Sequence, residues 1–419
     1  MKIKKKILIS TIISILLIAL IYVSDITNIP DSIILFKEEE LNINTIFGIS
    51  VKALETSNTD IDTAQSGEII QASSGSYANK EESINIGINL FGIKVKEVSV
   101  NVIDDVEVVP LGGLIGMKLY TNGVLVVGMS EIYGQNNQVY RPYENTGIKE
   151  GDTITKINDE YIVSTEDMTE CINASQGKEI KITYIHNNKT LETNITPIET
   201  DKNNYKVGLW VRDTAAGVGT ATFYDKNTGK VAMLGHGILD VDTEELIDIS
   251  DGKVTNTSVV SIIKGENGKT GRIQGIVEGQ KEIGTISKNT YYGVYGKLYN
   301  MNEIKGNTSK SVKIALRNEI QAGEATLMCA LDNGQVKEYT VEIQKIYLNN
   351  NSNNKSMLLK VTDEELLEKT GGIIQGMSGS PIIQNGKLIG ALTHVLVQNP
   401  TQGYAVFSDI MVKQMNEND

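Results

Sequence analysis

The chain begins with a stretch that is almost entirely apolar. Residues 7–23 read ILISTIISILLIALIYV, and Lys2, Lys4, Lys5 and Lys6 precede them. Positive charge followed by about 17 apolar residues is typical of an export signal or a short membrane anchor. We expect residues 1–24 to form an uncleaved anchor, because no small-residue cleavage site follows the run. Since lysines stay in the cytoplasm, the chain after Ser24 is expected outside it.

Two similar segments follow in which apolar and polar residues alternate. They read IFGISVK at 46–52 and LFGIKVK at 90–96, and alternation with a period of two predicts strands. The repeat is either one strand-turn unit used twice or a coincidence in a chain rich in Ile and Lys. Residues 55–83 are rich in Ser, Asn, Thr and acidic residues, which predicts a flexible linker. Residues 25–96 are therefore expected to form a small strand module with a flexible linker.

Residues 97–199 are predicted to form a domain of strands around one helix. Alternation runs to Pro110, glycines follow, and Asn122-Gly123 predicts a hairpin turn. Ser164 and Asp167 form a capping box that opens a helix, whose apolar face holds Met168, Cys171 and Ile172. The order of strands and helix, together with GIKEGDTITKIND, resembles a bacterial PDZ domain, which accepts an extended peptide as an added strand.

The resemblance to a PDZ domain implies a peptide-binding loop. The backbone N–H groups of four residues in a glycine-rich stretch would bind the peptide's carboxylate, because glycine lets amides converge. The alternative is an all-β domain whose glycines only make turns. The four residues are Leu114, Ile115, Gly116 and Met117.

Residues 200–419 carry many short alternating segments separated by turn dipeptides such as Asp251-Gly252 and Asn333-Gly334. This spacing predicts a closed β-barrel or a β-sandwich.

Composition excludes several classes of function. There are 39 basic against 52 acidic residues, a net charge of −13, and no basic cluster beyond the N-terminus, so nucleic acid is not an expected partner. Cys171 and Cys329 fall in different predicted domains and make no C-x-x-C pair, so neither a disulfide nor a structural zinc site is expected. No metal or other cofactor is expected.

One short segment carries a candidate nucleophile. Residues 376–381 read GMSGSP and precede a predicted hairpin. A serine hydroxyl needs a base to take its proton and backbone amides aimed at the developing oxyanion. Ser378 is the candidate nucleophile, and the N–H groups of Gly376 and Ser378 are the candidate oxyanion donors. The alternative is a β-turn with surface serines.

Three histidines could supply the base. His236 stands between two glycines at the end of a predicted buried strand, KVAML, where it can face a cleft. His186 is expected in a solvated turn, and His394 is expected to pack in the core. His236 is therefore the candidate base.

The acid that orients the base is less sharply indicated. Asp363 lies between His236 and Ser378, which gives the chain order His, Asp, Ser of chymotrypsin-type triads. Asp240 and Asp242 are rivals because they are close to His236 in sequence. Thr362 also makes a capping box with Glu365, so the acidic residues here could serve only a helix start.

The segments taken together resemble a known family. The membrane segment, the PDZ-like part, RDTAAGVGTATFYDKNTGKVAMLGHGILDVD and VTDEELLEKTGGIIQGMSGSPIIQNGKLIGALTHVLV closely resemble the stage IV sporulation protein B peptidases of endospore-forming bacteria. The resemblance covers about 90–419 and implies a chymotrypsin-like double β-barrel at 200–419. It places the catalytic residues on His236, Asp363 and Ser378.

The same resemblance implies a biological role. It implies an extracytoplasmic serine endopeptidase of sporulation, located in the space between the two forespore membranes. Such a peptidase cleaves itself and a membrane-associated regulatory protein, which leads to activation of the late mother-cell sigma factor. The PDZ domain would bind the substrate or the enzyme's own N-terminal segment. The alternative from another class is a catalytically inactive, membrane-tethered scaffold.

Overall fold

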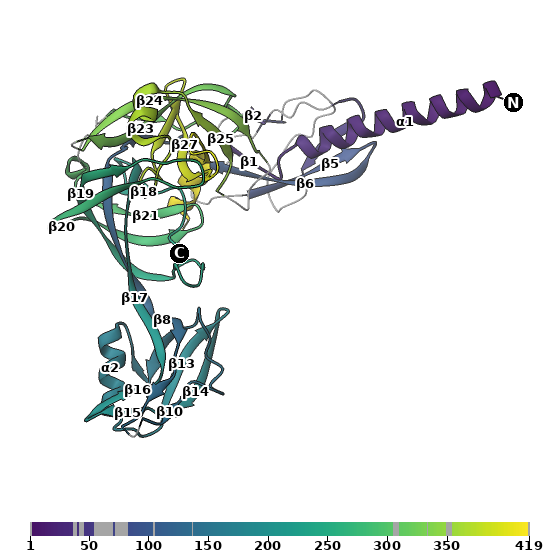
Figure 1. The fold of residues 1–419 in the computed structure, drawn as a ribbon. Helices are drawn as coiled ribbons and strands as arrows, with labels where there is room; N and C mark the ends of the chain where they lie inside the picture. Colours follow the sequence, from purple (N-terminus) through teal and green to yellow (C-terminus); the bar gives the residue numbers. More distant parts are fainter. Residues whose placement is uncertain are drawn as a thin grey trace.

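The chain is organised around a body of strands, with a smaller domain below it and a helix to one side (Figure 1). The computed structural model describes residues 2–36, 40–41, 46–53, 70–71, 83–103, 105–135, 137–304, 310–332, 334–348 and 354–417. The predicted flexible linker at 55–83 lies outside the described residues, apart from 70–71 and 83.

The projecting helix is α1 (Lys2–Asn28), whose segment Ile9–Asn28 is long and apolar enough to cross a bilayer. Its last turns pack on a four-stranded sheet of order β1-β6-β5-β3. In both copies of the sequence repeat, a turn leads into a strand of this sheet. The strands are β1 (Ser32–Phe36), β3 (Ile49–Ala53), β5 (Ser83–Leu90) and β6 (Ile93–Ile103), and β2 (Glu40–Leu41) pairs with β4 (Ile70–Gln71).

Six strands of the body pair in a ring, β8-β19-β20-β21-β18-β17 and back to β8. Alternate side chains point inward, so that Ile115, Met117, Val254 and Ile286 meet in one apolar core. Strands β7 and β22 extend the sheet beyond β17. The strands are β7 (Glu107–Pro110), β8 (Leu114–Met129), β17 (Leu209–Tyr224), β18 (Lys230–Met233), β19 (Ile249–Ile263), β20 (Arg272–Thr290), β21 (Gly293–Leu298) and β22 (Val312–Lys313).

A second closed barrel follows in the order β23-β24-β25-β28-β27-β26. Its core is a separate apolar cluster that includes Leu327, Val341, Leu359 and Phe407. The two closed barrels confirm the predicted double β-barrel. The elements are η1 (Met301–Glu303), β23 (Gly323–Asp332), β24 (Gln335–Ile346), β25 (Met357–Val361), α3 (Glu364–Thr370), β26 (Pro381–Gln384), β27 (Lys387–Val395), β28 (Gln402–Phe407) and α4 (Ser408–Asn416).

The strands β8 and β17 connect the smaller domain to the body, and they extend from the first barrel side by side (Figure 1). Its core packs Met168 and Ile172 of α2 (Thr165–Ala174) against the sheet β14-β13-β11-β8. The capping box of Ser164 and Asp167 is present as predicted. The strands are β9 (Ile132–Tyr133), β10 (Val139–Tyr140), β11 (Thr153–Ile157), β12 (Glu160–Tyr161), β13 (Ile180–His186), β14 (Lys189–Ile195), β15 (Ile198–Asp201) and β16 (Asn204–Lys206).

One sequence prediction for this region needs correction. Asn122-Gly123 does not make a hairpin, because β8 runs straight through it and Gly123 only bends the strand at φ +114°. The domain limits at 96/97 and 199/200 stay a prediction, and the strands near them belong to more than one packing unit. The four-stranded sheet continues to Ile103, and β8 and β17 each belong to both the barrel and the smaller domain. Local alternation cannot show that one strand serves two domains.

A buried ion pair fixes the C-terminal helix to the second barrel. Arg317 donates from Nε to Asp409 Oδ2 at 2.9 Å, and the two side chains are 5% and 0% exposed. The guanidinium also lies over the ring of Phe407 at 5.5 Å. Removing one partner would leave an uncompensated buried charge.

We expect Asp409→Ala to lower the free energy of unfolding by about 3–5 kcal/mol, because the charge of Arg317 loses its buried partner. Asp105→Ala is the control, since Lys313 and Asp105 are about half exposed and such pairs contribute about 1 kcal/mol or less. Urea-induced unfolding of the purified chain measures both. Equal, small changes would contradict the structural role of the buried pair.

Candidate active site

The loop that carries Ser378 is held in an unusual backbone conformation between the two barrels. Gly376 and Gly379 have φ angles of +100° and +95°. A Cβ atom at Gly379 would collide with Thr220 O and lie 2.6 Å from Leu234 N, so only glycine fits. Thr220 of β17 fixes the loop twice, donating from N to Ser378 O at 2.9 Å and from Oγ1 to Gly376 O at 2.8 Å.

The loop presents two free backbone donors. In the part of the chain that the structure describes, neither the amide of Gly376 nor that of Ser378 donates to an acceptor. The neighbouring amides are engaged, since Met377 N donates to Ile374 O and Gly379 N to Leu392 O. Two unengaged amides that flank a serine hydroxyl can stabilise an oxyanion.

The hydroxyl of Ser378 is bonded to a backbone carbonyl. Its Oγ donates to Thr393 O of β27 at 2.8 Å, and the side chain is partly buried. The described residues show no hydrogen bond between Ser378 and His236. Catalytic hydrogen bonds are often made only when substrate is bound, so the missing contact does not remove His236 as the candidate base.

His236 lies next to the Ser378 loop. It comes directly after Gly235, whose position for a Cβ atom is 3.1 Å from the Thr393 side chain. The Nδ1 atom is 2.8 Å from Gly237 O, and a carbonyl can only accept, so Nδ1 carries the proton and Nε2 has a free lone pair. Burial lowers the pKa of His236 below the usual 6.5, so the imidazole is neutral near pH 7 and can accept a proton.

His394 is closer to this site than the sequence suggested. Its ring centroid is 5.1 Å from that of His236, and its buried Nδ1 has no hydrogen-bond partner in the described chain. Burial, and then the neighbouring His236 and Lys355, lower the pKa of His394 to about 4. His394 directly follows Thr393, which lies beside Gly235. The sequence does not show that β27 lies beside Gly235, so it does not show that His394 is near His236.

The three acidic candidates are bonded to groups other than His236 in the described structure. Asp363 is the N-cap of α3, accepting from Leu366 N at 2.9 Å and from Thr340 N at 3.3 Å. Asp240 and Asp242 both pair with Arg212 of β17. In the described residues, no acidic side chain is hydrogen-bonded to His236, and Gly237 O takes the place of a carboxylate at Nδ1.

The predicted peptide-binding loop is not a loop. Leu114, Ile115, Gly116 and Met117 lie inside β8, where they pair with β17 on one side and, from Ile115 to Met117, with β19 on the other. Their side chains are buried in barrel cores, and their backbone is committed to the sheet. The glycines near this segment suggest a loop in the local sequence. The strands that pair with it are far away in the sequence, so local patterns do not show that it is a barrel strand.

A different segment lies beside the helix of the PDZ-like domain. Tyr205 N donates to Asn173 Oδ1 at 2.8 Å near the end of α2, and Thr165 N donates to Asp213 Oδ2 at 2.8 Å near its start. The start of β17 therefore runs antiparallel to α2. Leu209–Arg212 pair with β8 on one edge, and the described chain shows no strand on the other.

His186, expected in a solvated turn, instead lies at the end of β13 and pairs with buried Asp152 at 2.6 Å.

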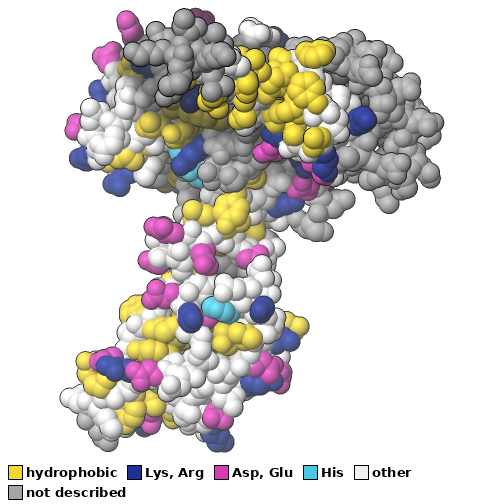
Figure 2. Space-filling view, turned by 90° about the vertical axis from the view of Figure 1, so that its right-hand side faces the viewer, with side chains coloured by type: hydrophobic (Ala, Val, Ile, Leu, Met, Phe, Trp, Pro, Cys, Tyr) yellow, Lys and Arg dark blue, Asp and Glu magenta, His cyan; other side chains and the backbone are white. Residues whose placement is uncertain are grey.

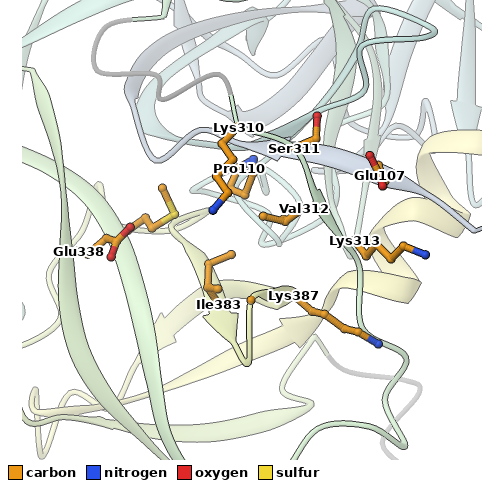
Figure 3. Close-up of a pocket in the computed structure, with 11 residues that line it drawn as sticks. Glu107, Pro110, Lys310, Ser311, Val312, Lys313, Glu338, Ile383 and Lys387 are labelled. Carbon is orange, nitrogen blue, oxygen red and sulfur yellow. The ribbon is translucent and has the colours of Figure 1, made fainter.

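The pocket drawn in Figure 3 lies away from these residues. It has a volume of about 420 Å³ and is bounded by Lys310, Lys313, Lys387, Glu107 and Glu338. Within the described residues, no cluster of His, Cys, Asp or Glu could hold a metal ion, and Cys171 and Cys329 are free thiols.

A model of the SpoIVB peptidase S55 family matches residues 203–412, about half of the chain. The chain belongs to the SpoIVB peptidase S55 family. A PDZ domain model matches residues 114–196. Both matches confirm the family resemblance, and a protein of this family is a serine peptidase that acts on proteins or peptides.

Individual relatives cover smaller parts. The zinc metalloprotease RasP of Shouchella clausii (strain KSM-K16) is 35% identical over 83 residues, which are 20% of this chain and only 19% of that relative. Among solved structures, the PDZ domain of the SdrC-like protein (Lmo2051) from Listeria monocytogenes is 23% identical, covering 22% of this chain and 87% of that one, with a TM-score of 0.17.

Two solved proteases are also similar. The Rv3671c protease from M. tuberculosis in its active form is 12% identical, with 61% of this chain and 89% of that chain covered and a TM-score of 0.27. The MamO protease domain from Magnetospirillum magneticum is 14% identical, with 48% and 88% covered and a TM-score of 0.26. With TM-scores this low, neither structure informs the geometry of the site.

We expect Gly379→Ala to abolish labelling of the chain by a fluorophosphonate probe and to lower its thermal stability. The new Cβ atom would push Thr220 O and Leu234 N away and so disturb the Ser378 loop and the strand end before His236. Gly386→Ala is the matched control. It also has a positive φ, but nothing lies within 4 Å of its Cβ position, so strain of about 1–2 kcal/mol is the expected cost. Full labelling of Gly379→Ala would show that the loop tolerates displacement.

Proposed function

We propose that the chain is a membrane-anchored, extracytoplasmic serine endopeptidase in which Ser378 is the nucleophile and His236 the base. The observation that carries the proposal is the pair of unengaged amides at Gly376 and Ser378, which flank a serine hydroxyl beside a neutral histidine. The family match supports the same reaction class. The helix α1 supports the anchor by its length and composition.

The reaction would begin with a rotation of the Ser378 side chain. Its Oγ gives up the hydrogen bond to Thr393 O and donates to Nε2 of His236 as substrate binds. His236 accepts the proton while Oγ attacks the scissile carbonyl, and the Gly376 and Ser378 amides donate to the oxyanion. His236 then gives the proton to the leaving amine, and water releases the acyl group from Ser378 by the reverse sequence.

Asp363 is proposed as the acid that orients His236, on the basis of chain order and family resemblance. In this structure its carboxylate caps α3. The proposal therefore requires that Asp363 gain a contact with His236 in the working enzyme. A substitution that keeps the cap but removes the charge separates the two roles.

The biological role is proposed from family membership. We infer a peptidase of sporulation that acts between the two forespore membranes. It cleaves itself and a membrane-associated regulatory protein and thereby leads to activation of the late mother-cell sigma factor. The PDZ domain would bind an extended segment of substrate, or of the enzyme's own N-terminal region, on the unpaired edge of β17 beside α2.

Ser378→Ala should abolish self-cleavage of the full-length chain in detergent, because no other group replaces the nucleophile. Intact-mass spectrometry would show wild-type fragments with cuts within residues 24–90 and a single intact mass for the variant. Ser380→Ala is the matched control. Its hydroxyl is buried in the same loop and faces the thiol of Cys329 rather than His236 or Ser378, so the cuts should persist. Two intact chains with no fluorophosphonate labelling of Ser378 would support the scaffold alternative instead.

Asp363→Asn tests the proposed acid. Asparagine caps helices about as well as aspartate, so the bond from Leu366 N and the helix α3 should be preserved. The long bond from Thr340 N is lost, because an amide nitrogen cannot accept it, so the thermal stability should fall only slightly. If Asp363 orients His236, the rate of self-cleavage should fall by about 10⁴-fold, as when a triad aspartate becomes asparagine. A rate within a few fold of wild type would limit Asp363 to its cap and leave Gly237 O as the partner of His236.

A further inference from the structure

The sequence repeat brings two phenylalanines together at one end of the four-stranded sheet. Phe47 and Phe91 occupy equivalent places in the two copies, and their ring centroids are 6.5 Å apart. Tyr22 of α1 joins them, with its ring 5.8 Å from that of Phe91 and its hydroxyl donating to Phe47 O at 2.7 Å. The repeat therefore builds an aromatic cluster against the N-terminal helix.

This cluster is exposed although it is apolar. Phe47 is 82% exposed, Phe91 65% and the next alternate residue, Ile93, 71%. In Figure 2, which looks at the molecule from the side on which α1 projects, hydrophobic side chains gather on the upper body, with charged side chains around them. An exposed apolar patch of this kind marks an interaction surface.

Phe91 also sits in a backbone conformation that does not favour it. Its φ is +48°, and the following Gly92 is at +84°, so the turn needs two residues in the left-handed region. Asparagine, aspartate or glycine would fit such a turn with less strain than an aromatic residue. The ring packs against Tyr22 and over Gly48, but these contacts leave 65% of Phe91 exposed.

The length of the helix indicates what covers the cluster. The candidate span Ile9–Asn28 has 20 residues, about 30 Å at 1.5 Å per residue, which just matches the hydrocarbon core of a bilayer. However, Tyr22 and Ile26 pack against the sheet core, and Asp25 accepts from Ile46 N. The sheet thus overlaps the last two turns of the span. Residues 7–21 alone would cover only about 22 Å.

We propose that this end of the four-stranded sheet, defined by Phe47, Phe91 and Ile93, rests in the outer surface of the bilayer that α1 spans. The aromatic rings would occupy the part of the hydrocarbon layer that residues 7–21 are too short to span. Aromatic residues concentrate at this level, near the membrane surface, in membrane proteins. Lys94 follows Ile93 and is half exposed, and its ammonium group is paired with Glu97 at 2.8 Å. Such an exposed pair is weak, so the ammonium group can turn to lipid phosphates at the surface of the bilayer. The opposite end of the same strands carries Asn85 and Asn101.

The contact would fix the direction in which the rest of the chain leaves the membrane. A single helix can rotate and tilt, whereas a helix with a sheet inserted beside it has one orientation. The inference rests on the membrane anchor of the proposed function and not on the peptidase chemistry, which self-cleavage measures separately.

Bromine quenching of tryptophan fluorescence tests the proposal on the full-length chain. Phe91→Trp is combined with Trp210→Phe, and the double variant is inserted in vesicles of phosphatidylcholine and phosphatidylglycerol whose acyl chains carry bromine. The wild-type chain is the matched control, because its native Trp210 is 64% exposed, about the same fraction as Phe91, but lies at the start of β17 beside α2. We expect the tryptophan introduced at position 91 to lose most of its emission and to shift to the blue, and Trp210 to keep its emission.

Each other outcome has a distinct meaning. If the chain stays with the vesicles in carbonate but bromine leaves the emission of the introduced tryptophan unchanged, the proposal is overturned while the anchor stands. A blue-shifted but unquenched emission that depends on the protein-to-lipid ratio would show that a second copy covers the cluster, which also overturns it. A chain that leaves the vesicles contradicts the anchor itself.

Discussion

The antiparallel pairing of β8 with β17 is the interaction on which the rest of the structure depends. Each strand has 16 residues, about 50 Å of extended chain, and the register runs from Leu209 opposite Met129 to Thr220 opposite Leu114. One end closes the first barrel, and the other completes the PDZ sheet. Thr220, the last residue of this pairing, also holds the Ser378 loop by two hydrogen bonds, so the strand pair sets the position of the nucleophile.

The shared strands also explain why the two domains are not joined by a flexible linker. Register shifts between Trp210 and Val211 and between Arg212 and Thr214 mark bulges, which twist the pair between its two sheets. Asp213, within the second bulge, bonds the N-terminus of α2, and Arg212 holds Asp240 and Asp242 of the loop that follows His236. Contacts of β17 therefore join α2 to the loop after His236 and, at Thr220, to the Ser378 loop.

Local sequence patterns predicted correctly those elements whose structure depends on interactions between residues close together in the chain. The capping box of α2, the strands after each repeat and the glycine-framed loops of His236 and Ser378 all depend on residues within a few positions of one another. Local sequence indicates a loop at Leu114–Met117, because only pairing with strands roughly 100 and 140 residues away makes them a barrel strand. It likewise indicates a core position for His394, since only the fold of β27 brings this residue to His236.

The candidate site holds both reactive groups against backbone carbonyls. Ser378 Oγ donates to Thr393 O, and His236 Nδ1 donates to Gly237 O. A carbonyl fixes the tautomer of the imidazole, but it stabilises an imidazolium less than a carboxylate does, and burial already disfavours the charged ring. Releasing one such hydrogen bond costs about 1 kcal/mol, which is small beside the binding of an extended peptide. For the proposed mechanism, the position of the serine is therefore a smaller requirement than a negative charge beside His236.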